Sequence, residues 1–594
     1  MTSQVISFLG VEDVFLEVGA DIDNLRRCLQ TLSLTDALIW CARLNLLVSN
    51  PELDPENHGR ETQKLILQWF FTKEQCELVW KKSEGFNKSV ICMRAGLLEL
   101  MRWVLLWCKN SEGDGETFRK QDVRQTFAKA MLIANKIWLD TTDFAQITTR
   151  PVDDEGRELL MLALRRNHEG SYIGHINPMM WVGFGHSIFC RKKYLEKHYT
   201  TLREDFRKAT GIEIDDYYIC KSFLVSHFYL KTLSEIAAKP ENSNGIFDIN
   251  SAGNEVLDSM KPAVRTYLEF ESQTIEELRK GFWGERLDVA TLSEAGSFDA
   301  RVMLDRPILR IRDGRGIILD SLFFAERAAA GPIFIIRKKL KKPAQELIGY
   351  YGAAFEDYTH FFFKKIYCAR VNKLGVEMSR PQQSGDVDIG LKLDRQLAIL
   401  EIKASFLNLN VIYGTDNAAY LEELRKKYVN TWGAEQLATA IKNLSTDVSV
   451  NGIAPRDLDR IFPILFVRDP HLDSALHPWF LAREFKTKLQ PDQDTGRGDM
   501  AKGRLSIPNL ITMTMDELLA LEDSIHRGIP FHKLLSDYTL EHRDRLISLN
   551  DFLALDPRYK KRIYKYKIVG RHMHKLIVKA RKKLFKNGMN NDHK

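Results

Sequence analysis

Cysteine pairs, long apolar runs and nucleotide-binding loops are all missing from this sequence of 594 residues. Its eight cysteines are scattered, and none belongs to the Cys-x-x-Cys pairs that build zinc ribbons and iron–sulfur clusters. We therefore expect reduced, buried thiols, as in a cytoplasmic protein. The phosphate-binding pattern Gly-x-x-x-x-Gly-Lys-Ser/Thr is also absent, so any ATP-driven step would require a partner protein.

No apolar run in the sequence is long enough to cross a membrane. Residues 97–107 form one of the longest apolar stretches, but Glu99 and Arg102 interrupt it. Such a stretch is too short and too charged for a membrane span. Residues 1–4 lack the basic start of a secretory signal. These absences predict a soluble, cytoplasmic protein without a membrane span.

The texture of the sequence predicts an α+β protein in three parts. Residues 1–285 carry apolar side chains at helical spacing, which predicts a large all-α N-terminal domain of unknown role. Residues 286–555 mix strand and helix patterns, which predicts one α/β domain with a mixed central sheet. Within it, residues 486–504 are rich in Gly, Asp, Gln and Lys and predict a mobile loop. Residues 556–594 form a basic C-terminal arm.

Three histidines in the helical part are candidates for a metal site. His168, His175 and His186 lie close together in an aromatic stretch. Their spacing matches no helical metal-binding pattern such as His-Glu-x-x-His. We therefore interpret them as core or loop histidines.

A hairpin predicted in the α/β domain contains the candidate catalytic residues. Residues 387–393 and 397–404 both alternate apolar and polar side chains, as half-buried strands do. If Asp394 and Arg395 form a two-residue turn between them, residues whose numbers sum to 789 stand opposite each other. Each residue can then be assigned to a face of the sheet and to a cross-strand partner.

This register places two carboxylates side by side. Asp388 faces Glu401, and Asp386 faces Lys403. Directly opposed like charges destabilise a sheet unless a cation lies between them. Carboxylate oxygens suit Mg²⁺ or Mn²⁺, ions that also bind phosphate and water. The alternative is an exposed hairpin face on which Asp386 and Lys403 form an ordinary ion pair, but this leaves the Asp388–Glu401 pair unexplained.

The same residues resemble a known nuclease motif. An Asp near the start of one strand, followed by Glu401-Ile402-Lys403 on the next, is similar to the PD-(D/E)xK nuclease superfamily. The proline that names the motif is missing, because Val387 precedes Asp388. The resemblance implies a restriction-endonuclease-like fold in which Asp388 and Glu401 bind the metal ion and Lys403 positions water or stabilises charge.

The resemblance extends to two helices and covers residues 350–470. Superfamily members often carry a Glu on the preceding helix, and Glu356 has that place here as an additional metal ligand. Some also use a Gln on a later helix, where Gln436 could contact the phosphate or orient the site. The implied activity is hydrolysis of phosphodiester bonds with Mg²⁺ or Mn²⁺, with DNA favoured over RNA. A large helical domain joined to such an endonuclease also resembles bacterial antiphage defence effectors.

Three alternatives stay open at this point. One is a structural interaction protein without this fold, which a structure lacking the 386–403 hairpin would establish. The nuclease fold could be catalytically silent, with the protein acting through nucleic acid or protein partners. An active enzyme could instead await a protein partner or trigger. Loss of divalent-metal binding in Asp388→Ala would separate an enzyme from a silent scaffold.

The net charge of +7 resides in the C-terminal arm. From Pro557 onward there are 14 Lys or Arg and one acid, Asp592, so the arm carries +13 and the preceding residues about −6. Such a segment binds phosphates without reading bases, although it could also bind an anionic membrane or a protein partner. The predicted nucleic-acid-binding residues are Arg558, Lys560, Lys561, Arg562, Lys565, Lys567, Lys579, Arg581, Lys582 and Lys583.

Overall fold

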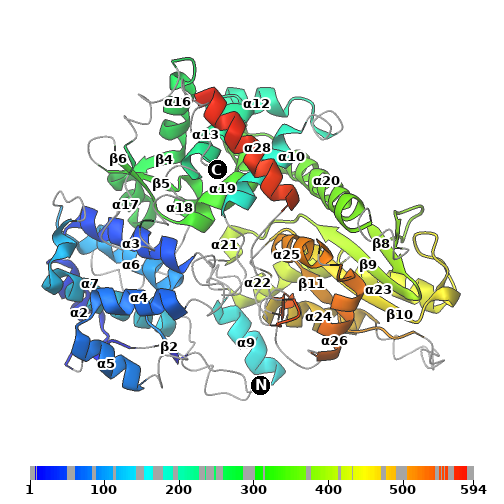
Figure 1. The fold of residues 1–594 in the computed structure, drawn as a ribbon, viewed down its shortest axis with the longest axis horizontal. Coiled ribbons are helices and arrows are strands. Elements are labelled where there is room, and N and C mark those ends of the chain that lie inside the picture. The colour runs from blue at the N-terminus through cyan, green and yellow to red at the C-terminus, as the bar shows by residue number, and fades with distance from the viewer. Residues whose placement is uncertain are drawn as a thin grey trace.

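The computed structural model defines the fold of most of the chain (Figure 1). It describes residues 7–8, 10–15, 17–49, 60–82, 89–110, 116–141, 153–164, 178–191, 198–225, 235, 247–248, 258–284, 301–311, 315–368, 376–412, 416–430, 432–469, 472, 476–489, 505–526, 528–541, 548–549, 552–553, 556–559 and 567–584. These residues form a mixed α+β protein, as the sequence predicts.

The first part of the chain is a bundle of helices with one short parallel strand pair. Its elements are β1 (Ser7–Phe8), α1 (Val11–Val14), α2 (Ile22–Leu29), α3 (Leu34–Val48), α4 (Arg60–Phe70), α5 (Lys73–Lys82), β2 (Ser89–Val90), α6 (Arg94–Trp107) and α7 (Gln121–Thr141). The charges that interrupt the apolar run lie inside α6, where Arg102 contacts Glu99 at 3.5 Å and both are buried. No helix among the described residues is long and apolar enough to cross a membrane.

The middle of the chain is mainly helical but contains a four-stranded sheet. Its elements are α9 (Asp154–Leu164), α10 (Pro178–Cys190), α12 (Leu202–Thr210), α13 (Ile214–Leu224), β3 (Phe247–Asp248), α16 (Lys261–Glu271), β4 (Ser272–Thr274), α17 (Ile275–Trp283), α18 (Arg301–Asp305), β5 (Ile308–Arg310), β6 (Arg315–Ile318) and α19 (Ser321–Leu340). The strand order is β3-β6-β5-β4. Residues 1–285 are therefore mostly helical, with β1 to β4 as short strands.

The last part of the chain holds a five-stranded sheet and the helices around it. Its elements are α20 (Ala344–Phe362), β7 (Glu377–Ser379), β8 (Ile389–Leu393), β9 (Gln396–Lys403), α21 (Leu409–Ile412), α22 (Asn417–Leu424), the π-helical turn η9 (Arg425–Val429), α23 (Ala434–Ser445), β10 (Arg460–Val467), α24 (Leu476–Leu489), β11 (Ile511–Met513), α25 (Met515–His526), α26 (Phe531–Glu541) and α28 (Lys567–Leu584). The strand order is β11-β10-β9-β8-β7. β7, β8 and β9 pair antiparallel, while β9, β10 and β11 pair parallel.

The predicted hairpin has the predicted register. Ile389 pairs with Leu400, and Leu393 pairs with Gln396 across the two-residue turn. The first turn residue, Asp394, adopts a φ of 52°, in the left-handed region that tight hairpin turns require. The ladder is shorter than predicted, however, because β8 begins at Ile389 and not at residue 387.

Helices cover both faces of the five-stranded sheet. On one face, Leu391 of β8 and Leu400 of β9 belong to the same buried cluster as Phe355 of α20. On the other face, Ile399 of β9 packs in a cluster with Leu437 of α23. Figure 1 shows α20 running beside the antiparallel strands and α23 beside β10. β9 is therefore the central strand of a three-layer arrangement.

The hydrophobic clusters cross the predicted domain boundary. The boundary at 285 lies outside the described residues, and the three-domain division stays a prediction. On its N-terminal side, Met161 of α9 packs in the same cluster as Ile399 of β9. On its C-terminal side, Leu309 of β5 packs with the N-terminal helices. Residues 486–489 of the predicted mobile loop belong instead to α24, which extends to Leu489, and residues 490–504 lie outside the described part.

The basic C-terminal arm contains a helix that is docked on the protein. Leu576, Ala580 and Leu584 of α28 are buried in the cluster that also holds the sheet. The helix packs across α10 and α13, as Figure 1 shows. Lys579 contacts Asp215 of α13 at 3.5 Å. The apolar stripe of the arm is therefore part of the core of this protein.

Candidate active site

The structure brings four of the five predicted catalytic residues into one electrostatic group. Asp388 lies directly before β8, Glu401 and Lys403 lie on β9, and Glu356 lies on α20. The charges of Lys403 and Glu356 act on Asp388, and those of Asp388, Lys403 and Glu356 act on Glu401. Gln436 of α23 contacts the backbone of the loop that precedes Asp388.

Asp388 is held against β9 by a backbone contact. Its Oδ2 accepts a hydrogen bond of 2.7 Å from the amide of Ile402, the residue between Glu401 and Lys403. The chain bends at Asp388, and Val387 packs in the cluster on the opposite face from Ile389. The pKa of Asp388 is raised by burial, against the lowering effects of the Ile402 amide and Lys403.

Glu401 is the residue of the group whose negative charge is least favoured by its surroundings. Its side chain is 2% exposed, and its Oε1 contacts Lys403 Nζ at 2.5 Å. Its other oxygen, Oε2, is buried without a hydrogen-bond partner. Burial and then the neighbouring Asp388 raise the pKa of Glu401 from 4.5 to about 8. A buried acceptor with a raised pKa and no donor is a position that a cation would stabilise.

Asp386 does not pair with Lys403, contrary to the predicted register. It is 5% exposed, and its carboxylate accepts the backbone amides of Gln382, Gln383 and Asn451 at 2.7, 3.0 and 2.8 Å. The ladder ends at Ile389, so the alternation of faces no longer holds at 386. Asp386 therefore shapes the loop that leads into Asp388.

Asn451 clamps the residue before Asp388, a role that the sequence did not reveal. Its Oδ1 accepts the amide of Val387 at 3.0 Å, and its Nδ2 donates to the carbonyl of Val387 at 2.9 Å. Its own amide donates to Asp386. Asn451 adopts a φ of 51°, which asparagine tolerates better than most residues. The Asn451-Gly452 pair signals a turn in the sequence, but nothing in the sequence connects it to Val387.

Substituting Asn451 with alanine is expected to destabilise the protein by about 2–4 kcal/mol, because both backbone groups of buried Val387 lose their partner. Urea unfolding of the purified variant measures this change. The control is Asn410→Ala, at an exposed position of α21, where little change is expected. A midpoint for Asn451→Ala that equals the control would contradict the clamp.

His360 is a second residue that the sequence analysis missed. It lies one turn after Glu356 on α20, and its Nε2 is 3.6 Å from Glu356 Oε1. The side chain is buried, and its Nδ1 has no hydrogen-bond partner. Its charge acts on Asp388. The spacing of Glu356 and His360 by four residues on a helix was visible in the sequence, but only the fold places it beside the hairpin.

Gln436 acts on the loop and not on the carboxylates. Its Nε2 donates to the carbonyl of Asp386 at 2.8 Å, and its Oε1 is buried without a partner. Together with Asn451, it holds the backbone on the N-terminal side of Asp388. The hydrogen bond from Gln436 to Asp386 therefore supports a positioning role for Gln436. Its Oε1 remains as an unused acceptor.

No three of the described residues in the hairpin group have all their ligand atoms within 4.8 Å of one another. Among the described residues, the His, Cys, Asp and Glu group with all ligand atoms within 4.8 Å of one another is His186, Cys190 and Asp215. In the hairpin group, one oxygen of Asp388 and one of Glu401 are engaged by Ile402 and Lys403. Binding of one ion by three of these residues thus requires side chains of the hairpin group to rotate.

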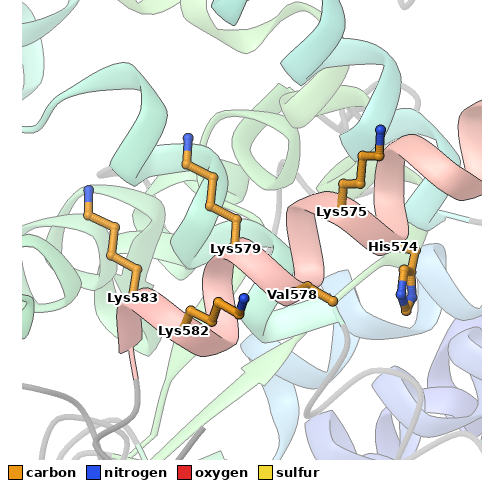
Figure 2. A pocket seen from close by; sticks show the side chains of 6 residues that line it. All are labelled: His574, Lys575, Val578, Lys579, Lys582 and Lys583. Atoms are coloured by element: carbon orange, nitrogen blue, oxygen red, sulfur yellow. The ribbon is translucent and has the colours of Figure 1, made fainter. Parts of the chain in front are cut away.

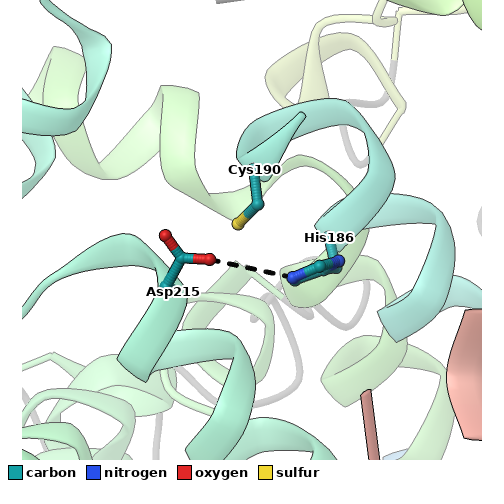
Figure 3. A group of neighbouring side chains, drawn as sticks. All are labelled: His186, Cys190 and Asp215. Atoms are coloured by element: carbon teal, nitrogen blue, oxygen red, sulfur yellow. Dashed lines mark ion pairs between the residues drawn. The ribbon is translucent and has the colours of Figure 1, made fainter. Parts of the chain in front are cut away.

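The cluster of His186, Cys190 and Asp215 lies elsewhere, between α10 and α13 (Figure 3). His186 Nε2 lies 3.9 Å from Asp215 Oδ1, while Arg203 donates to Asp215 at 2.6 Å and Lys579 lies 3.5 Å away. Burial, and then Asp215, raise the pKa of the Cys190 thiol well above its usual range. Two cations already neutralise the one carboxylate, so this cluster serves to anchor α28 better than to hold a metal ion.

The predicted nucleic-acid-binding residues have different environments. Lys579 and Lys583 contact Asp215 and Asp216 of α13, and Arg558 contacts Asp556 and Asp537. Lys582 is exposed and lines a shallow surface pocket with His574, Lys575, Val578, Lys579 and Lys583 (Figure 2). Lys567 and Arg581 belong to α28, but their side chains are outside the described set, as are Lys560, Lys561, Arg562 and Lys565.

Comparison with known proteins gives no relative for this chain. No protein-family model, curated protein or solved structure matches it. The case for a function therefore rests on the geometry described above.

Proposed function

We propose that this protein is a divalent-metal-dependent nuclease whose centre is formed by Asp388, Glu401 and Lys403. The observation that carries the proposal is Glu401, a buried carboxylate with one oxygen on Lys403 and the other without a partner. Its raised pKa shows that the protein alone does not stabilise this charge. If Glu401 and Lys403 formed only a structural ion pair, the second carboxylate of Asp388 beside them would serve no purpose.

The order of elements supports the restriction-endonuclease-like fold that the sequence resemblance implies. Helix α20 precedes the antiparallel strands β7, β8 and β9, and after α22 and α23 the chain returns as β10, parallel to β9. The resemblance places the motif residues on the second and third of these strands and on the flanking helices. Here Glu401 lies on β9, Asp388 lies directly before β8, and Glu356 and Gln436 lie on α20 and α23, which is close to that arrangement.

The residues present fit a divalent cation. Asp388, Glu401 and Glu356 would hold it through oxygen, and His360 through nitrogen, a ligand set that suits Mn²⁺ at least as well as Mg²⁺. When bound, the cation supplies a Lewis acid for the phosphate and lowers the pKa of water. Lys403 carries the positive charge that stabilises the phosphate in the transition state or holds the water. Asn451 and Gln436 fix the backbone before Asp388.

The test is cleavage of plasmid, linear duplex, single-stranded DNA and RNA with Mg²⁺, Mn²⁺ or EDTA. We expect metal-dependent cutting by the wild type, with DNA favoured, and at least a hundredfold loss in Lys403→Ala. Lys392→Ala, on neighbouring β8, is the matched control and should cut normally. Cutting that persists in Lys403→Ala, or in EDTA, would overturn the proposal.

A catalytically silent protein is the second candidate, and one observation favours it. Lys403 occupies one oxygen of Glu401, and the ligand atoms of the hairpin group are not gathered within 4.8 Å. Such a protein would act in the cytoplasm through nucleic acid or protein partners and would bind no divalent ion at Asp388. An active nuclease awaiting a trigger, as in antiphage defence, would bind the ion without cutting until the trigger arrives.

The exposed lysines of α28 are expected to bind nucleic acid electrostatically. In Figure 2, Lys575, Lys579 and Lys583 form one row on the helix and Lys582 lies on the next. The double variant Lys575→Ala and Lys582→Ala should reduce the slope of log affinity against log salt by about two, one unit for each phosphate contact. Fluorescence anisotropy with a labelled duplex at several salt concentrations measures this. An unchanged slope, equal to that of Lys73→Ala in α5, would remove α28 from the interface.

A further inference from the structure

One tryptophan near the start of α23 is largely exposed. Trp432 is 67% exposed, against 47% for Trp80 of α5. It lies in the short connection between η9 and α23. Burial of an indole is normally favourable. A large aromatic side chain that stays exposed on a turn is therefore a candidate for binding a ligand.

The turn after Trp432 has a backbone that requires glycine. A Cβ at 433 would lie 2.0 Å from the carbonyl oxygen of Tyr428. Gly433 therefore lies directly against the end of η9, while Trp432, the residue before it, stays exposed.

This turn is attached to both loops of the active site. On one side, the hydroxyl of Tyr428 donates to the carbonyl of Ser405 at 3.0 Å, two residues after Lys403. On the other side, Gln436 donates to the carbonyl of Asp386, two residues before Asp388. Trp432 lies between these two contacts along the chain. It is thus fixed at the end of the sheet where Lys403 and Asp388 lie.

We propose that Trp432 stacks on an unpaired base of the substrate next to the phosphate that is cleaved. The inference rests on the proposed nuclease function and assigns its substrate class as nucleic acid with single-stranded character at the cleavage site. Stacking on an exposed indole tolerates every base, because every base offers a π face. Inside an intact duplex those faces are covered by neighbouring bases, so only the two terminal base pairs of a blunt duplex offer a free face to Trp432.

The surroundings favour a base over a protein surface as the occupant. The nearest exposed large apolar side chain along this helix, Val448, follows the opposite end of α23, about 18 Å away for twelve residues. Among the described residues, Trp432 is thus separated along the chain from the next large apolar side chain that is exposed. The exposed side chains of Lys426 and Asn430 just before it suit a polar, negatively charged ligand.

Binding in EDTA tests the inference without cleavage. The probes are labelled single-stranded DNA and RNA oligonucleotides and a blunt duplex of the same sequence, measured by anisotropy. We expect Trp432→Ala to weaken single-strand binding about tenfold to a hundredfold and duplex binding by less than about threefold. Trp432→Phe, which keeps a ring, should retain most of the affinity. Trp80→Ala is the matched control and should bind as the wild type does.

The outcomes separate this inference from the proposed function. Wild type that cuts nucleic acid, with Trp432→Ala binding single strands equally well, would overturn the stacking and leave the nuclease standing. An equal loss for single strand and duplex would also overturn it, since stacking on unpaired bases predicts a difference. Wild type that neither binds nor cuts any of these polymers would overturn both.

Discussion

Glu401→Gln is expected to abolish metal-dependent cleavage while making the metal-free protein more stable. Cleavage should fall about a thousandfold or more, because glutamine is a weaker ligand and carries no charge. Stability should rise because folding at neutral pH protonates a carboxyl that is ionised in the unfolded chain, since its pKa is raised from 4.5 to about 8. At pH 7 that shift corresponds to about 3 kcal/mol, of which the loss of the Lys403 contact offsets part, so we expect a gain of about 1–3 kcal/mol.

The pH dependence of stability identifies Glu401 as the cause. The folded state favours the protonated form, so Glu401 costs nothing below its ordinary pKa of 4.5. The cost grows as the pH rises from 4.5 to about 8. Urea unfolding in EDTA should show wild type losing stability over this range relative to Glu401→Gln. The control is Glu484→Gln on α24, which removes a carboxylate that pairs with Arg425 of η9. A Glu401→Gln variant less stable than wild type at pH 7 would contradict this account.

Divalent-metal affinity is expected to rise steeply with pH up to about 8. The ion displaces the proton of Glu401, so below that pKa each pH unit should lower the affinity about tenfold. Between pH 6 and 8 the expected change is about a hundredfold, with release of close to one proton per Mn²⁺. Calorimetric titration in two buffers of different ionisation enthalpy measures both quantities. A constant affinity over this range, with no proton release, would show that Glu401 is not a ligand.

The hairpin was predictable because its signals are local. Alternating side chains in two adjacent segments and a two-residue connection determine the register, and the observed pairs from Ile389–Leu400 to Leu393–Gln396 follow it. The end of the ladder was not predictable. A bend at Asp388 sends Asp386 to three backbone amides, and the sequence pattern contains no sign of where pairing stops.

The remaining site residues depend on contacts between distant segments. Asn451 meets Val387 across 64 positions, and His360 reaches the hairpin only because α20 packs on the sheet. Arg468, fully buried after β10, donates its amide to the carbonyl of Lys403 and pairs with Glu326 of α19. No local pattern encodes these pairings, since each requires the three-dimensional order of the strands.

In the C-terminal arm, too, the sequence predicted the local element but not its contacts with distant segments. Its charge and helical spacing predicted a phosphate-binding segment, and α28 does form. Local sequence could not show that Asp215 and Asp216 of α13 would take Lys579 and Lys583 as partners. A basic helix can thus be partly a structural element, and its lysines divide between internal pairs and an exposed face.

The most direct test of the central claim is Mn²⁺ binding at pH 8, followed by electron paramagnetic resonance on wild type and Asp388→Ala. Both proteins are first shown to have the same far-ultraviolet circular dichroism. The account predicts saturable Mn²⁺ binding by the wild type that is lost in Asp388→Ala. Equal binding by the two proteins, or none by the wild type, would contradict it.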